Sequence, residues 1–346
     1  MILPLTASAF TVYYFWKYVE GWLFIRMMLQ CKDFIKFVFI RKIMICIGVF
    51  LSIYSILQYM GWLGTEVQLT DTVDVHYVEG TILGPYNSTY FALGQMSPLC
   101  FLFSCSKVND ETKQLHKVLY ALLSIFISFP ALFCGSRTAL VLIVSSFVFY
   151  YWVIRKMKDL AVLATFGAIL ILFFSISKGL DFGSFLGENN RTLERAEFLS
   201  DNKEQSVKGR SLYFLLAFDI DRYDYSSLVP FVGAGFYVAP MEGRYRIGYG
   251  YHNAYLFSFE QLGCMGFLLF ICLYYRTIIR SFRYRRYNPF AALVFAYVLG
   301  LVIVGPAGNT FWRGNATGNI NTLLVFLFSI GTVNLSNTTK QYNYVS

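Results

Sequence analysis

The residue best suited to chemistry is His252, which stands in the segment Tyr251-His252-Asn253 just before a long apolar stretch. If that stretch is a helix, the partial positive charge at its N-terminus disfavours protonation of the imidazole. A neutral imidazole near pH 7 can accept a proton as a general base. The alternative is a polar residue that caps the helix at the membrane interface. Tyr251 and Asn253 are further candidate contact residues beside it.

A second candidate is Arg137, in the segment Gly135-Ser136-Arg137-Thr138, which joins two apolar stretches with almost no loop. A guanidinium held at the membrane surface can bind two oxygens of one phosphate. The alternative is that it extends to lipid headgroups without a further role. Other arginines of the connecting segments could converge on the same phosphate. They are Arg210, Arg244, Arg246 and Arg313.

The sequence lacks the motifs of nucleotide-dependent and metal-dependent chemistry. No Walker loop or dinucleotide fingerprint is present, so we predict no nucleotide cofactor. The three histidines do not have the spacing of metal ligands, and the seven cysteines lie in or beside apolar stretches without a CxxC pair. We therefore predict no metal and no other cofactor. Several arginines with one neutral histidine favour a site for a lipid-linked phosphate or pyrophosphate, whose bond supplies the energy.

Membrane-spanning helices must hold such a site, because 56% of the residues are hydrophobic and only 14% are charged. A spanning helix needs roughly 20 mainly apolar residues. We predict an all-α polytopic membrane protein with about nine spans, within a range of about nine to eleven. The predicted spans are 2–25, 43–63, 85–106, 118–134, 138–154, 160–177, 253–275, 289–307 and 319–335.

The lysines and arginines of the short connections predict the orientation, because such residues are retained on the cytoplasmic side. Four basic clusters fall on one side in the nine-span arrangement, which puts the N-terminus outside and the C-terminus inside. The net charge of +9 then reflects topology and anionic membrane lipids, so we predict no nucleic-acid partner. The clusters are Arg26, Lys32, Lys36, Arg41 and Lys42; Lys107, Lys113 and Lys117; Arg155, Lys156 and Lys158; and Arg276, Arg280, Arg283, Arg285 and Arg286.

The chain divides into three parts on this reading: spans one to six in 1–177, a large outer loop in 178–252, and three spans with a cytoplasmic tail in 253–346. The loop carries nine basic and ten acidic residues, so its arginines are not a topology signal. A short apolar segment that starts at Arg210 predicts a helix lying in the membrane interface.

Three stretches are distinctive in their order and spacing. The first is Gly84-Pro-Tyr-Asn-Ser-Thr-Tyr-Phe-Ala-Leu, and the second is Gly135-Ser-Arg-Thr-Ala-Leu. The third runs from Gly209-Arg210 through Pro230-Phe-Val-Gly-Ala-Gly-Phe and Tyr251-His-Asn-Ala-Tyr-Leu to Leu262-Gly-Cys-Met-Gly-Phe. Over roughly residues 80–275, the chain resembles the O-antigen ligase and O-antigen polymerase superfamily of bacterial envelope glycosyltransferases.

The resemblance implies a metal-independent C-type glycosyltransferase fold in the bacterial inner membrane, with the site facing the periplasm. It implies an undecaprenyl-pyrophosphate-linked glycan as donor and direct displacement with inversion at the anomeric carbon. His252 would activate the acceptor hydroxyl, while Arg137 and Arg210 would hold the pyrophosphate. Where many relatives carry a glutamate nine residues after the histidine, this chain has Gln261, so no carboxylate is assigned a role.

Three functions are compatible with these features. A polymerase would join lipid-linked repeat units of an O-antigen or capsule, with a chain-length regulator protein as a candidate partner. A ligase would move the finished glycan onto the lipid A core or onto protein. A transporter of lipid-linked glycan is a more distant alternative, because internal repeats with broken helices are typical of that class and none is evident here.

Overall fold

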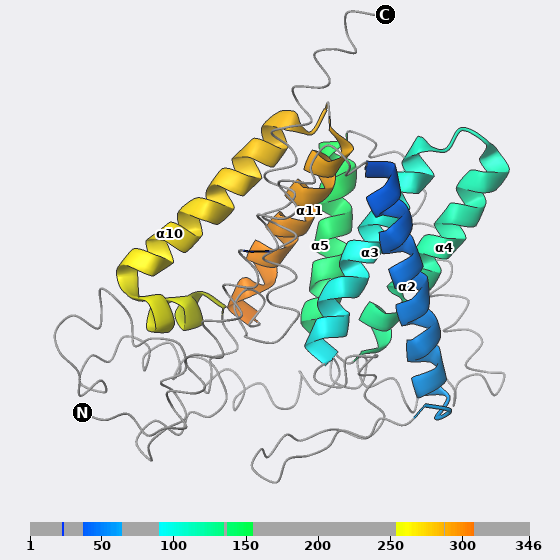
Figure 1. The fold of residues 1–346 in the computed structure, drawn as a ribbon, viewed down its shortest axis with the longest axis horizontal. Helices are drawn as coiled ribbons and strands as arrows, with labels where there is room; N and C mark the ends of the chain where they lie inside the picture. Colours follow the sequence, from blue (N-terminus) through cyan, green and yellow to red (C-terminus); the bar gives the residue numbers. More distant parts are fainter. Residues whose placement is uncertain are drawn as a thin grey trace, which may run out of the picture. The chain divides into compact units, whose positions relative to one another are not determined.

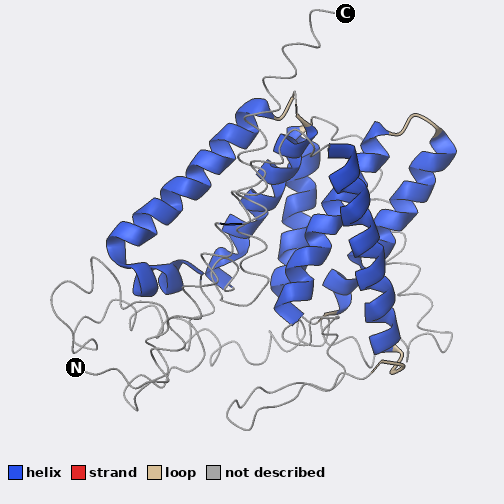
Figure 2. Ribbon diagram, in the orientation of Figure 1, coloured by secondary structure: helices blue, strands red, loops and turns tan. Residues whose placement is uncertain are grey.

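The structure is a computed structural model that describes residue 23 and residues 37–63, 90–134, 137–154, 254–286 and 288–307. These ranges consist of helices and short connections, without a strand (Figure 2). They fall into two compact units, and α2 to α5 with residues 295–300 make up the described part of one of them. The elements in Figure 1 are α2 (Phe37–Tyr59), α3 (Tyr90–Asp110), α4 (Gln114–Phe133), α5 (Arg137–Val153), α10 (Ala254–Tyr284), α11 (Pro289–Val304) and the 3₁₀ turn η6 (Gly305–Ala307).

Six of the predicted spans overlap these ranges, and the described part of each contains helix. Three helical segments are long and apolar enough to cross a membrane, namely Phe37–Gln58, Gln114–Ala131 and Gly263–Tyr284. The described part of the chain is therefore all-helical and has the character of a membrane protein. The predicted spans 160–177 and 319–335, and 2–25 apart from Leu23, lie outside the described residues, so the number of nine stays a prediction.

The start of α2 differs from the predicted span 43–63, because the helix already begins at Phe37 and includes Arg41 and Lys42. The sequence suggested an interruption at these two cations. Arg41 is buried, forms an ion pair with Asp110 at the end of α3, and lies 5.1 Å from the centre of the Phe37 ring. Because the bundle itself neutralises the guanidinium, the helix continues through it.

Helix α3 lies at the centre of its unit, packed against α2, α4 and α5. Its 21 residues are enough to span a membrane, yet it is less apolar than the three segments above because it carries buried glutamine and serine side chains. A helix surrounded by other helices does not have to be apolar on every side, since its polar groups can bond to its neighbours. This position explains how α3 can carry buried polar side chains.

Hydrogen bonds between helices satisfy several of these buried hydroxyls. Ser97 of α3 donates to the carbonyl oxygen of Ile127 on α4 at 2.8 Å, and the hydroxyls of Ser104 and Ser124 are hydrogen-bonded at 2.8 Å. Both pairs join α3 to α4 in an antiparallel register. Small polar residues that link helices in this way are typical of packing in membranes, where burial of apolar surface provides little attraction.

The outward faces of the same helices are apolar. Phe39, Phe50 and Ile53 of α2 are exposed, and Leu119 of α4 and Val144 of α5 are exposed as well. A water-soluble protein buries its apolar side chains and exposes its polar ones, whereas this bundle exposes apolar faces and buries serines. A hydrocarbon environment around these helices accounts for both observations.

Helix α11 is apolar along its whole length, and residues 290–298 are all buried. Its start is fixed by local chemistry: the side chain of Asn288 accepts a hydrogen bond from the N–H of Phe290 at 2.9 Å, and Pro289 occupies the first turn. Within the α2 to α5 unit, Tyr297 donates to the carbonyl oxygen of Gln95 at 3.1 Å. The central part of α11 thus packs as a core helix.

Close approach of α11 to α5 depends on Gly300. A Cβ atom built at this glycine would lie 3.0 Å from Leu142 Cδ1 and would overlap the hydroxyl oxygen of Ser146, which is buried and has no hydrogen-bond partner in the described structure. We predict that Gly300→Ala lowers the free energy of unfolding by about 1–3 kcal/mol. Ser146→Ala alone should be neutral or slightly stabilising, because it removes an unsatisfied buried group.

The double variant Gly300→Ala/Ser146→Ala should recover most of the stability that Gly300→Ala loses, because the Ser146 hydroxyl oxygen that overlaps the new Cβ is absent. Thermal unfolding of the wild type, the two single variants and the double variant in the same detergent measures this double-mutant cycle. Equal stability of the Gly300→Ala variant and the wild type would show that the two helices are not in this contact.

Candidate functional site

The predicted catalytic histidine and most of its predicted neighbours lie outside the described residues. This applies to His252, Arg210, Arg244, Arg246, Arg313, Tyr251 and Asn253. Their roles therefore stay predictions. The structure does describe the helices that begin beside two of the candidates, His252 and Arg137.

Arg137 is the first residue of α5, and α4 ends at Phe133 with Cys134 as its C-cap. The prediction that Arg137 stands where two apolar helices meet through almost no loop is therefore confirmed. The first backbone N–H groups of a helix have no partner within the helix and carry partial positive charge. A permanent cation at such a start makes this end of α5 favourable for an anion.

Helix α10 begins at Ala254, two residues after His252 in the chain. A helix therefore starts one residue after the predicted start of the span at residue 253. Tyr255, in the first turn, donates a hydrogen bond to the carbonyl oxygen of Val302 at 2.7 Å. This bond ties the first turn of α10 to the last turn of α11, a contact that the sequence did not indicate.

The predicted span 253–275 is not one continuous helix, because α10 breaks at Gly263. The backbone there has φ 63° and ψ −173°, a combination that only glycine adopts readily. Phe259 and Phe267 pack edge to face across the break, with ring centres 6.0 Å apart. The segment that can cross a membrane is Gly263–Tyr284, so the first nine residues of α10 precede the span instead of opening it.

We predict that Gly263→Ala destabilises the protein by about 1–3 kcal/mol, because an alanine Cβ makes this backbone conformation strained. Gly266→Ala, three residues later in the regular part of α10, is the matched control and should not show this strain. Thermal unfolding in detergent compares the two variants. If Gly266→Ala lowered the stability as much as Gly263→Ala, a role of the backbone conformation at Gly263 would be contradicted.

A second group of charges lies at the connection between α3 and α4. The carboxylate of Glu111 lies 2.9 Å from Lys107 Nζ and 3.8 Å from His116 Nδ1. The hydrogen bond from Lys107 lowers the pKa of Glu111. The ion pair of Arg41 and Asp110 places Arg41, from the first predicted basic cluster, at the same end of α3 as Lys107, from the second.

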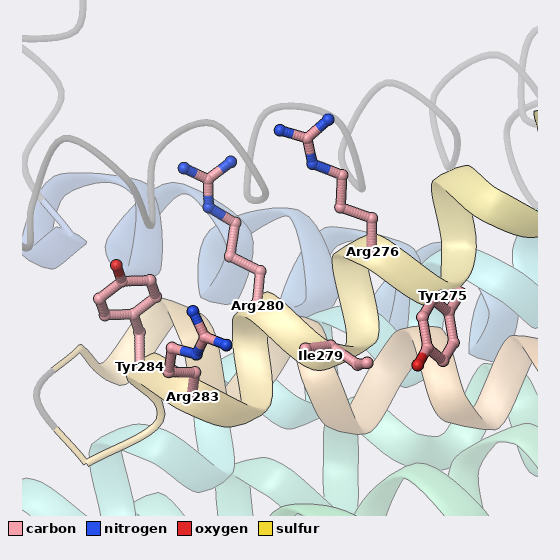
Figure 3. Close-up of a pocket in the computed structure, with 6 residues that line it drawn as sticks. All are labelled: Tyr275, Arg276, Ile279, Arg280, Arg283 and Tyr284. Atoms are coloured by element: carbon pink, nitrogen blue, oxygen red, sulfur yellow. The ribbon is translucent and has the colours of Figure 1, made fainter.

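A third charged feature was interpreted from sequence only as a topology signal. Arg276, Arg280 and Arg283 lie within the last turns of α10 and not in the connection after it, and they line a cavity of about 340 Å³. Tyr275, Ile279 and Tyr284 complete the described lining (Figure 3). Their spacing of three and four residues, which places side chains on one face of a helix, was the signal available in the sequence.

Among the described residues, no group of three histidine, cysteine, aspartate or glutamate side chains could hold a metal ion. The predicted absence of a metal at His252 stays a prediction, because that residue is outside the described ranges. Comparison of the chain with protein-family models, with curated proteins and with solved structures found no match.

Proposed function

We propose that this protein is an inverting glycosyltransferase that polymerises lipid-linked repeat units of an O-antigen or capsule. The donor would be a glycan on undecaprenyl pyrophosphate, and the acceptor would be a sugar hydroxyl of another lipid-linked unit. The proposal includes about nine spans in a C-type glycosyltransferase fold, within the bacterial inner membrane. The N-terminus would be periplasmic, the C-terminus cytoplasmic, and the site would face the periplasm.

One observation carries the proposal: both motif segments with a chemical candidate coincide with helix starts. Arg137 opens α5, and His252 precedes the first residue of α10 by two positions. Helix N-termini favour anions and keep a nearby imidazole neutral, which are the two properties that a pyrophosphate leaving group and a general base require. Three helical segments that can span a membrane support the lipid-linked nature of the substrate.

In the proposed reaction, His252 takes the proton from the acceptor hydroxyl as its oxygen attacks the anomeric carbon of the donor. The bond between that carbon and the pyrophosphate oxygen breaks, with inversion of configuration. The electron pair leaves with undecaprenyl pyrophosphate, whose growing negative charge Arg137 and Arg210 stabilise. Arg244, Arg246, Arg313, Tyr251 and Asn253 are the further candidate contacts to phosphate or glycan.

The acceptor separates polymerase from ligase. Purified protein supplied with lipid-linked repeat units alone should form a ladder of longer lipid-linked glycans, seen by gel electrophoresis and mass spectrometry. Product that appears only after lipid A core or an acceptor protein is added would assign ligase activity instead. Movement of the lipid-linked unit across vesicles without a new glycosidic bond would indicate a transporter. A chain-length regulator, as a partner, should alter the ladder's length distribution.

A further inference from the structure

The cavity at the end of α10 is lined by three cations, Arg276, Arg280 and Arg283. Within the described ranges, no carboxylate lies within ion-pair distance of Arg276, Arg280 or Arg283. In Figure 3, the side chains of Arg276 and Arg280 rise from the same side of the helix, one turn apart. Unpaired like charges on adjacent turns repel one another, so this surface is favourable for an anion that would neutralise them.

The opposite face of the same turns is buried. Tyr274, Thr277 and Ser281 lie against the protein, whereas Arg276 and Arg283 are exposed. The arginines therefore face away from the packed side of α10. Each guanidinium presents several N–H donors in a planar arrangement that matches the oxygens of a phosphate.

An apolar stripe leads along α10 to this cavity. Met265, Leu268 and Leu269 are exposed, with 70% of Leu269 accessible. From Leu269 to Arg280 the helix rises by about 17 Å, close to the hydrocarbon depth of one leaflet of a bilayer. Tyr284, at the end of the segment Gly263–Tyr284 and in the lining of the cavity, has the amphipathic ring that is typical of the membrane-water interface.

We propose that the cavity binds the phosphate headgroup of an anionic phospholipid through Arg276, Arg280 and Arg283, with an acyl chain along the apolar stripe. The stripe favours a lipid over a soluble phosphate, because a lipid can contact the arginines and the exposed apolar side chains of the same helix at once. The site is separate in sequence from Arg137 and His252, and it does not depend on the proposed transferase activity.

The experiment uses the purified full chain in detergent micelles, titrated with phosphatidylglycerol or with phosphatidylcholine of identical acyl chains. Native mass spectrometry counts the bound lipids. The test variant is Arg276→Gln/Arg280→Gln/Arg283→Gln. The matched control, Lys42→Gln/Lys113→Gln/Lys117→Gln, removes three charges from α2 and from the start of α4, and thermal unfolding checks that each variant is folded.

We expect the wild type to bind phosphatidylglycerol at least about 10-fold more tightly than phosphatidylcholine, and the test variant to lose about 10- to 100-fold of that affinity. The control should lose less than about 3-fold. If the test variant does not fold, Arg280→Gln alone should lose about 5-fold. Equal losses in test variant and control would overturn the proposal, because they would indicate diffuse charge attraction. Displacement of the lipid by about 10 mM inorganic phosphate would also overturn it, in favour of a soluble phosphate site.

Discussion

The His252→Ala variant is expected to lose glycan transfer by about 10²- to 10⁴-fold while it still inserts and folds. The reason is that a sugar hydroxyl is a poor nucleophile until its proton is removed. In the proposed site, the imidazole just before α10 is the group that accepts this proton. The rate of ladder formation by the purified variant measures the loss, and its thermal unfolding in detergent reports on the fold.

His116→Ala is the control for this variant. His116 lies in the first turn of α4 near Glu111, in a part of the chain to which no role in transfer is assigned. Its replacement should leave transfer within about 2-fold of the wild type. Wild-type transfer by a folded His252→Ala variant would contradict the proposal of a general base at this position.

Arg137→Lys is expected to lower kcat by about 10- to 100-fold, although the positive charge is retained. A lysine ammonium is a point charge, and it cannot donate two parallel hydrogen bonds to the oxygens of a leaving pyrophosphate. The planar guanidinium of Arg137, the first residue of α5, can donate two parallel hydrogen bonds. The partial positive charge of the helix N-terminus also favours an anion. Arg137→Gln should lose more, since it removes the charge as well.

Steady-state kinetics with a lipid-linked donor separate kcat from KM for both variants. Arg286→Lys, two residues after the end of α10, is the control and should behave as wild type. If Arg137→Lys retains full kcat, then charge alone is sufficient at this position. In that case the interpretation of Arg137 as a residue that extends to lipid headgroups would be favoured.

The sequence allowed the helices of the described part to be predicted because their apolar stretches are long. The ends of these helices were harder to predict where charged residues lie beside an apolar stretch. Arg41 seemed to interrupt a span, but its ion pair with Asp110 joins residues that are far apart in the chain. A pattern along the chain contains no information on such a partner, so the first turn of α2 could not be assigned.

The packing inside the bundle was also outside the reach of sequence patterns. Gly300 is one of 26 glycines, and only the position of Ser146 beside it gives it a role. Gly263 lies in a segment that was noticed for its family resemblance, yet the break it makes depends on backbone angles that the residue type merely permits. A contact with a distant segment decides the first case, and the backbone conformation decides the second.

For the candidate site, the starts of α5 and α10 were predictable because a polar residue precedes each apolar stretch. Whether Arg137 and His252 act on one substrate stays a prediction. The arginines near the end of α10 were interpreted as a topology signal, since cytoplasmic loops are rich in such residues. Their position inside a helix, along one cavity, adds a second interpretation that composition alone does not distinguish.

The central claim is that this protein forms a glycosidic bond with inversion and releases undecaprenyl pyrophosphate. The most direct measurement supplies purified protein with repeat units labelled with ¹³C at the anomeric carbon. Magnetic resonance then follows the new linkage, and release of undecaprenyl pyrophosphate is quantified in the same sample. We predict one pyrophosphate released for each inverted linkage formed, and neither product with His252→Ala. Absence of any new linkage with the wild type, whether lipid-linked units or lipid A core serve as acceptor, would contradict the account.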